Sequence, residues 1–167
     1  MSSLSKTLAP GIRIGFIVGN RDLIRELRAL RRLMLRHPAA NNERSVGLFL
    51  AMGYHDALLR RLRQAYAERS QRMAVALATH LPDVTFTTVA GASSYWLRFP
   101  EGVDTRALAR EAADLGVLIE PGDVFFDSNA AGAVPFNYAR LGFASIDSAR
   151  IEPGLATLAR ASAKVLA

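Results

Sequence analysis

The chain has 167 residues, half of them hydrophobic, so it holds enough apolar side chains to build a core and does not resemble a disordered tail. It contains no cysteine, which excludes disulfides and thiolate metal sites. It also has no apolar run of the roughly 20 residues that cross a membrane, and no signal peptide ahead of the polar motif that follows Met1. These features predict a cytoplasmic protein without a membrane partner. The formal net charge of +6 comes from 19 arginines and only two lysines, against 15 acidic residues, and it raises a nucleic-acid-binding interpretation.

One of the two lysines lies in a motif at the start of the chain. Residues 3–15 read Ser-Leu-Ser-Lys-Thr-Leu-Ala-Pro-Gly-Ile-Arg-Ile-Gly. The amine of Lys6 can act as a nucleophile or form an imine, and the planar guanidinium of Arg13 suits a phosphate. With the hydroxyl of Ser3 and glycines that allow close approach of the backbone, these residues form a candidate cradle for a phosphorylated aldehyde. A loop lysine at the entrance of a strand is the alternative that spacing alone leaves open.

A strand is predicted at residues 12–18, which are β-branched, aromatic and continuous. An amphipathic helix follows, with Asn20 or Asp22 as its N-cap and Pro38 after its end. Its polar face carries Arg21, Arg25, Arg28, Arg32 and Arg36. Both a nucleic-acid surface and a solvated face fit this arginine stripe, and the lack of interleaved aromatic residues favours the solvated face.

The next segment predicts helices separated by short breaks. Residues 38–43 are polar and predict a break, Val46–Met52 predicts a brief apolar helix, and Gly53 marks a boundary. A long helix is predicted from about His55 to about His80. A helix of that length can link two domains.

After residue 82 the pattern changes to short strands joined by turns. A helix capped by Asp104 or Thr105 and closed by Gly116 interrupts them. The small, polar and glycine-bearing residues 127–136 predict a mobile loop that follows the short apolar piece Val124–Phe126. The predicted strands are residues 84–89, 94–99, 117–119 and 137–143.

A closing helix is predicted from about Ser148 to Leu166. Proline is unfavourable beyond the first turn of a helix, so Pro153 leaves open a start nearer Glu152. Together, the elements predict an α/β protein with a small α+β domain, in which helices cover an antiparallel or mixed sheet of about four strands.

Arg140 stands in the middle of an otherwise apolar predicted strand. Burial of an unpaired guanidinium is costly, so Arg140 needs a partner. The partner is an acidic residue of the chain, solvent at a sheet edge, or the carboxylate of a substrate. The strand pattern by itself favours the acidic residue.

The motif around Lys6 resembles the Schiff-base segment of fold-type I aminotransferases, which use pyridoxal 5′-phosphate (PLP). In the most similar subgroup that segment reads Ser-aromatic-Ser-Lys-Thr-Leu-x-Pro-Gly-x-Arg-hydrophobic-Gly, and this chain departs from it at Leu4. The run that starts at Gly116 is similar to a second motif of the same family, Gly-Val-x-hydrophobic-x-Pro-Gly-x-x-Phe. There it precedes a loop and a strand with an arginine. The resemblance covers the whole chain.

The resemblance implies a role for each candidate residue. Lys6 is expected to form the internal aldimine with PLP, and Ser3 and Arg13 to hold the cofactor phosphate. Arg140 is expected to bind the α-carboxylate of an amino acid or a related carboxylate ligand. Residues 1–52 are interpreted as a remnant of the large PLP-binding domain, and residues 53–167 as the small C-terminal domain.

A narrower resemblance concerns regulators. The run Val-Leu-Ile-Glu-Pro-Gly-Asp-Val-Phe-Phe and the later run Tyr-Ala-Arg-Leu-Gly-Phe-Ala-Ser-Ile are similar to the aminotransferase-like domain of MocR-type regulators of the GntR family. Such proteins bind DNA through an N-terminal winged helix-turn-helix, which nothing in this chain resembles. Two functions stay open. The parent protein is an aminotransferase acting through the Lys6 aldimine, or the chain is the effector-sensing and dimerisation domain of a regulator.

The same resemblance implies what the chain lacks. The family residues that pair the pyridinium nitrogen and stack on the ring precede the lysine, so we expect the chain alone not to transaminate, and whether it retains PLP stays open. The surface that the preceding half normally covers is apolar, so we expect a homodimer or a larger assembly. No metal site is expected, because the three histidines lie at predicted helix ends.

Overall fold

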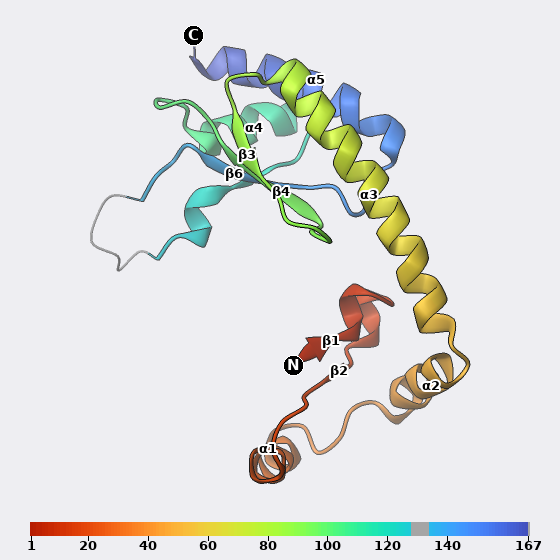
Figure 1. Cartoon of the computed structure of the whole chain (residues 1–167). Coiled ribbons are helices and arrows are strands. Elements are labelled where there is room, and N and C mark those ends of the chain that lie inside the picture. The colour runs from red at the N-terminus through yellow and green to blue at the C-terminus, as the bar shows by residue number, and fades with distance from the viewer. Residues whose placement is uncertain (128–133, 167) are drawn as a thin grey trace. The chain divides into compact units, whose positions relative to one another are not determined.

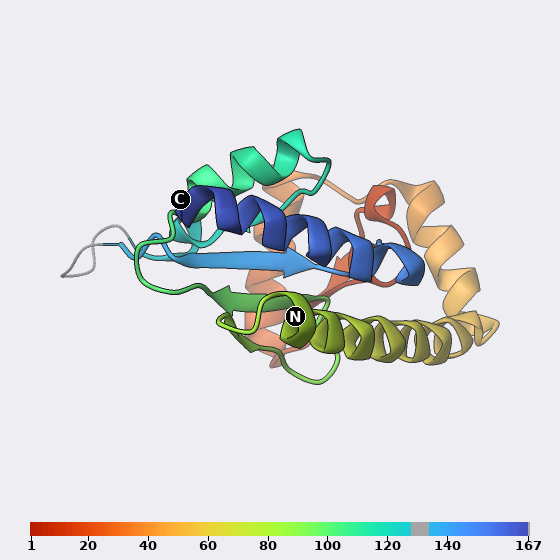
Figure 2. The same ribbon diagram turned by 90° about the horizontal axis from the view of Figure 1, so that it is seen from above.

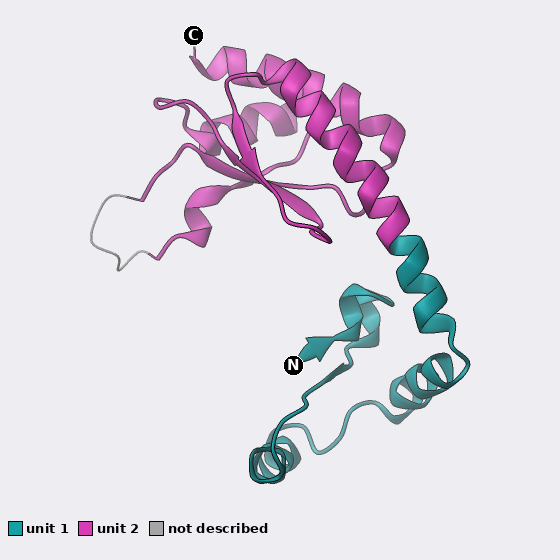
Figure 3. Ribbon diagram, viewed as in Figure 1, with its two compact units in different colours: residues 1–62 teal, residues 63–167 magenta. Residues whose placement is uncertain are grey.

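The structure is a computed structural model that describes residues 1–127 and 134–166 (Figure 1). It divides into two compact units, residues 1–62 and residues 63–167, and the boundary lies inside helix α3 (Tyr54–His80) (Figure 3). The assignment of residues 1–52 to a large-domain remnant stays a prediction.

The first unit begins with a short antiparallel pair of strands. Its elements before the first α-helix are β1 (Ser2–Ser3), the 3-10 helices η1 (Leu4–Lys6) and η2 (Pro10–Ile12), and β2 (Gly15–Phe16). The predicted strand at residues 12–18 is therefore much shorter than expected. Strand pairing requires a partner, and among the described residues β1 offers only two positions opposite β2.

Two helices complete this unit before α3. Helix α1 (Arg21–Met34) begins as predicted, because the Oδ1 atom of Asn20 accepts a 2.8 Å hydrogen bond from the backbone N–H of Leu23. Helix α2 (Ala40–Ala51) begins earlier than predicted, so the expected polar break at residues 38–43 is wrong. Nothing in residues 40–43 breaks a helix, and Pro38 lies before the first turn, where it is tolerated.

The second unit contains a four-stranded antiparallel sheet in the order β3-β4-β6-β5, which confirms the predicted fold class. The predicted third strand is displaced from residues 117–119. Gly116 has φ +85° and the N–H of Val117 donates a 2.8 Å bond to Ala112 O, so this segment closes the preceding helix instead of joining the sheet. The strands are β3 (Thr85–Thr87), β4 (Ser94–Arg98), β5 (Glu120–Pro121) and β6 (Tyr138–Gly142).

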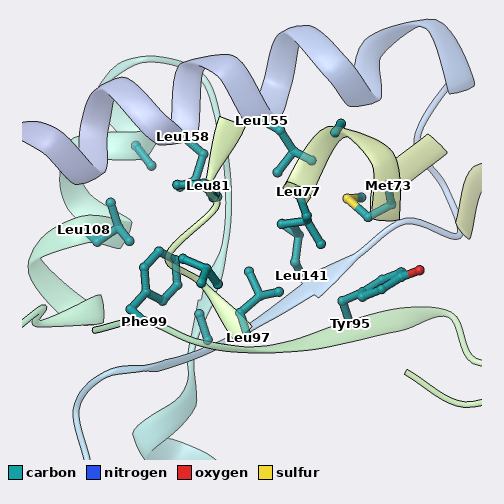
Figure 4. Packing of buried hydrophobic residues seen from close by; sticks show 14 of the residues in the cluster. Met73, Leu77, Leu81, Tyr95, Leu97, Phe99, Leu108, Leu141, Leu155 and Leu158 are labelled. Atoms are coloured by element: carbon teal, nitrogen blue, oxygen red, sulfur yellow. The ribbon is translucent and has the colours of Figure 1, made fainter. Parts of the chain in front are cut away.

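Helices α4 (Thr105–Asp114) and α5 (Ser148–Leu166) and the C-terminal part of α3 cover one face of this sheet (Figure 1 and Figure 2). Figure 4 shows Tyr95, Leu97 and Leu141 pointing from the strands into the core that these helices build. Because successive residues of a strand point to opposite faces, the residues between them project from the other face. The core lies on one side of the sheet, and the functional candidates of this unit lie on the other.

Helix α5 settles the question that Pro153 raised. The backbone N–H of Ala149 donates a 3.0 Å hydrogen bond to Oδ1 of Asp147, so the helix starts at Ser148 and Pro153 lies inside it. The alternative start nearer Glu152 is wrong. Of the predicted mobile loop, residues 128–133 lie outside the described residues. None of the described helices combines the length and the apolar character needed to cross a bilayer.

Candidate functional site

The first unit gathers Ser3, Lys6 and Arg13 on one closed loop, residues 3–15, which we call the lysine loop. Ser3 pairs with Gly15 between β1 and β2, and the N–H of Leu4 donates a 2.9 Å bond to Ile14 O, so both ends of the loop are held together. Lys6 is the last residue of η1, and its side chain is exposed. The pairing thus brings the three predicted cofactor-binding residues into one small segment.

Local hydrogen bonds shape the lysine loop around the lysine. Ser3 is the N-cap of η1, where its Oγ atom accepts a 3.3 Å bond from the N–H of Ser5. Its hydroxyl hydrogen stays available to donate. Thr7 donates from Oγ1 to Leu4 O at 3.3 Å, and the Leu4 side chain is buried. Leu4, where the family pattern has an aromatic residue, therefore still anchors the loop in its unit.

Arg13 adopts a left-handed backbone conformation, with φ 49° and ψ 38°. Residues other than glycine rarely adopt this conformation, and where they do the strain tends to mark ligand sites. The neighbouring Gly15 is required by space, because a Cβ atom there would lie 2.7 Å from Ser2 O. The sequence offered no signal for the Arg13 conformation, since glycine is the residue that usually indicates it.

The chemistry of the lysine loop suits a phosphate and an aldehyde. Residues 1–20 contain the cations Lys6 and Arg13, four hydroxyl side chains, and no aspartate or glutamate. An ammonium and a guanidinium without acidic neighbours in the sequence provide charge for a dianion and an amine for a carbonyl group. By this criterion the residues present fit the PLP that the sequence motif implies.

Arg140, the fourth candidate, lies in the second unit on the sheet face opposite the helices. Its strand neighbours Ala139 and Leu141 are buried, whereas the Arg140 side chain is 45% exposed. Arg140 is exposed despite its apolar strand, because the described helices of this unit pack on the opposite face of the sheet. Its Nε atom lies 2.8 Å from Oε2 of Glu120, so the acidic partner expected from the strand pattern is present.

Around Arg140 lies a cluster that we call the aromatic face: Trp96, Phe125, Phe126 and Tyr138. The rings of Trp96 and Tyr138 are stacked with 5.7 Å between centroids, and Phe125 meets Trp96 edge-on at 5.7 Å. The Arg140 Cζ atom lies 5.7 Å from the Phe125 centroid, within cation–π range. Sequence reasoning missed this cluster. The alternation of β4 predicts that Trp96 and Tyr95 project from opposite faces of the sheet. The position of Trp96 beside Arg140 depends on the register between β4 and β6.

An ion pair links the 3-10 helix η3 (Gly122–Phe125) to helix α4, and η3 carries Phe125 of the aromatic face. Arg106 of α4 donates from Nε to Oδ2 of the buried Asp123 at 2.8 Å. Arg106 lowers the pKa of Asp123 while burial opposes the shift, and the pair raises the pKa of Arg106. Because the folded pKa of Asp123 is depressed, its contribution to stability is present above the usual carboxyl range and is lost as pH falls through the folded pKa.

Among the described residues, no group of three or more histidine, aspartate and glutamate side chains is placed to hold a metal ion. The candidate residues lie on the lysine loop in one unit and at Arg140 with the aromatic face in the other.

Comparisons with known proteins give a consistent result. The model of the family "aminotransferase class I and II" matches residues 1–158. The HTH-type transcriptional regulator TauR of Rhodobacter capsulatus is 40% identical over 96% of this chain and 33% of its own length. The 2-aminoadipate transaminase of Thermus thermophilus is 32% identical over 100% of this chain and 41% of its own. The crystal structure of LysN, an α-aminoadipate aminotransferase of T. thermophilus complexed with N-(5′-phosphopyridoxyl)-L-leucine, has a TM-score of 0.87 at 31% identity and is matched over 98% of this chain and 41% of that chain.

Proposed function

The chain belongs to the aminotransferase class I and II family, and from this premise we propose that its parent protein transfers amino groups between amino acids and 2-oxo acids with PLP as cofactor. The chain spans about a third to two fifths of the length of the relatives compared above. The activity is therefore proposed for the whole protein, to which this chain contributes the reactive lysine and the carboxylate-binding arginine. The lysine loop is the observation that carries the proposal.

Each residue of the lysine loop has one task in this proposal. The Ser3 hydroxyl and the Arg13 guanidinium bind the cofactor phosphate by donating hydrogen bonds to its oxygens. Bound PLP supplies the electron sink that lets an amino acid lose its α-proton. The Lys6 amine holds the cofactor by its aldehyde end and serves as the base that takes up and returns that proton.

Arg140 orients the ligand in this proposal. A guanidinium binds a carboxylate through parallel N–H donors, which fixes the direction in which the rest of the amino acid extends. A bound and oriented substrate reacts faster because the geometry of the reaction is set before the chemical step. The exposed position of Arg140 on the open sheet face supports this role, since a ligand can reach it there.

The proposal predicts that PLP is trapped at Lys6. With only two lysines in the chain, reduction with borohydride in the presence of PLP can label Lys6, Lys164 or the N-terminus. Lys6 is expected to be labelled well ahead of Lys164, because Ser3 and Arg13 concentrate the phosphate beside it, whereas the Lys164 ammonium is ion-paired with Glu111. Peptide mass spectrometry after a time course of reduction measures the two rates.

Two variants complete this experiment. Lys164→Arg leaves Lys6 as the only ε-amine and is expected to keep the labelling rate, whereas Arg13→Ala is expected to lower the rate at Lys6 severalfold while leaving the rate at Lys164 unchanged. Equal labelling of Lys6 and Lys164 in the unaltered chain would contradict a cofactor cradle at the lysine loop.

A second function is favoured by the 40% identity to the regulator TauR. In this alternative the chain is the effector-sensing and dimerisation part of a MocR-type regulator of the GntR family, is itself catalytically inactive, and reaches DNA only through a separate N-terminal domain. The sequence encoded ahead of Ser3 in the gene discriminates the two functions. A winged helix-turn-helix there favours the regulator, and a continuous large PLP domain without one favours the enzyme.

We also propose that the chain associates with itself through the first unit. Helix α1 has no buried residue, and its Leu27, Leu30 and Met34 line an open hollow of about 890 Å³ together with Phe16 and Ile17 of this unit. Apolar surface of this kind gains free energy when a second copy covers it.

Light scattering measures this association. The chain is expected to run as a dimer or larger species at high concentration, and Leu30→Glu is expected to shift it toward the monomer by placing a charge in the apolar surface. The matched control is Leu118→Glu in the second unit, whose side chain is also exposed. A monomer at all concentrations would contradict the proposal.

A further inference from the structure

Strand register places Trp96, Arg140 and Glu120 in one row across three neighbouring strands. Arg140 of β6 pairs with Trp96 of β4 on one side and with Glu120 of β5 on the other. Directly opposite residues in antiparallel strands have Cβ atoms about 5 Å apart, so their side chains interact. The guanidinium of Arg140 thus lies between an aromatic ring and a carboxylate on the open face of the sheet.

Glu120 forms an ion pair with only the Nε side of the Arg140 guanidinium. Arginine presents five N–H donors, one on Nε and four on the two Nη atoms. The Glu120 carboxylate contacts Nε at 2.8 Å, with the two side chains 55% and 45% exposed. Within residues 1–127 and 134–166, no acceptor is hydrogen-bonded to either Nη atom of Arg140. The Nη edge therefore keeps donors available for an incoming carboxylate, with Glu120 as its neighbour.

Among the described residues, aromatic rings and a second cation also lie on this face of the sheet. Phe125 lies beneath the guanidinium, with 5.7 Å between its centroid and Cζ, and Trp96 meets Phe125 edge-on. Arg98 lies in the next row, opposite Tyr138, and its Cζ atom is 6.0 Å from the Tyr138 centroid. A ligand held by Arg140 therefore meets an acidic side chain beside it and an aromatic surface around it.

Resting on the proposed function of Arg140, we propose that Glu120 is a specificity-determining residue, so that this site takes a ligand with a single carboxylate and an apolar body and rejects a ligand with a second carboxylate. A ligand with one carboxylate forms the ion pair with Arg140, and only that one charge is repelled by Glu120. A second carboxylate on a short ligand stays within a few ångströms of Glu120, and the repulsion of like charges at that distance offsets what it gains from Arg98.

The experiment compares butyrate with succinate, which have the same number of carbons and differ by one carboxylate. Trp96 is the only tryptophan of the chain, so its single indole N–H resonance in a ¹H–¹⁵N NMR spectrum reports binding beside Arg140. Both ligands are titrated into the whole chain at equal ionic strength, and the dissociation constants are compared between variants. Thermal unfolding of each variant confirms that it is folded.

The unaltered chain is expected to bind butyrate more tightly than succinate. Glu120→Gln is expected to tighten succinate binding by about three- to fivefold and butyrate binding by no more than about twofold, which reverses or abolishes the preference. Glu152→Gln removes the same charge from α5 on the helix side of the sheet and is expected to leave the ratio unchanged. Arg98→Met in the Glu120→Gln background is expected to weaken succinate alone.

The two proposals fail in different ways. If Arg140→Met leaves the binding of both carboxylates unchanged, or if neither ligand shifts the Trp96 resonance in any variant, Arg140 is not the carboxylate site and the inference falls with it. If binding requires Arg140 but Glu120→Gln leaves the ratio of the two constants unaltered, or if the unaltered chain prefers succinate, the role of Glu120 is overturned while that of Arg140 stands.

Discussion

Gly122→Ala is expected to destabilise the second unit by about 1–3 kcal/mol and to move Phe125 away from Arg140 and Trp96. An alanine Cβ at this position would lie 2.6 Å from Cβ of Tyr138 and 2.7 Å from its carbonyl carbon and oxygen. Two of these atoms belong to the backbone of β6, which is an interior strand of the sheet, so the side chain cannot simply rotate away. The start of η3 must move outward instead.

The displacement has a defined readout. Phe125 belongs to η3, Phe126 follows it, and both rings contact Trp96 with centroids 5.7 and 6.0 Å away. We expect a change in tryptophan fluorescence and a shifted indole resonance, together with the lower midpoint of unfolding. Gly142→Ala is the matched control, because it lies on β6 itself and a Cβ there meets no atom within 4 Å. Equal behaviour of the two variants would contradict the close approach of η3 to β6.

Gly122 belongs to the Pro-Gly-Asp run that the sequence identifies as part of a family pattern. The sequence does not show why a glycine is needed there. Gly122 allows η3 to start against the backbone of Tyr138, and Asp123 binds Arg106 to hold it there. Both contacts join segments far apart in the chain, and local sequence carries no information about which distant segments meet.

The helices were the elements that sequence reasoning placed best. The bounds of α3 and α4 and the Asn20 cap of α1 follow from local signals, namely helical spacing of apolar residues, capping side chains and a terminal glycine. The two-residue strands β2 and β5 were misplaced or overextended, because the length of a strand depends on the partner strand opposite it. Helix α2 begins at Ala40, inside the segment predicted as a break, because polar residues such as Asn41 and Asn42 are tolerated in a first helical turn.

The candidate site divides in the same way. The grouping of Ser3, Lys6 and Arg13 was predictable because they are close in sequence. The exposure of Arg140 was not, because an apolar strand pattern does not reveal that only one sheet face is covered. The strand pattern predicts an acidic partner for Arg140. Only the register between β5 and β6 identifies that partner as Glu120.

Leu97→Ala is expected to have the largest effect on stability, a loss of about 3–5 kcal/mol from the second unit. Leu97 is fully buried on β4, where Phe86 and Ala139 lie opposite it on the two neighbouring strands. The alanine at position 139 is too small to fill the space that the leucine side chain leaves. The loss therefore includes a cavity as well as the transfer free energy of the deleted atoms.

The measurement is urea unfolding followed by tryptophan fluorescence, which reports the second unit alone because the only tryptophan, Trp96, lies next to Leu97 on β4. A domain has about 5–15 kcal/mol of stability in total, so the variant is expected to unfold at a much lower urea concentration. Leu118→Ala, in the same unit but 83% exposed, is expected to change stability by less than about 0.5 kcal/mol. A comparable loss in both variants would mean that the helices do not pack on this face of the sheet, and the open face that holds Arg140 would then have no rigid support.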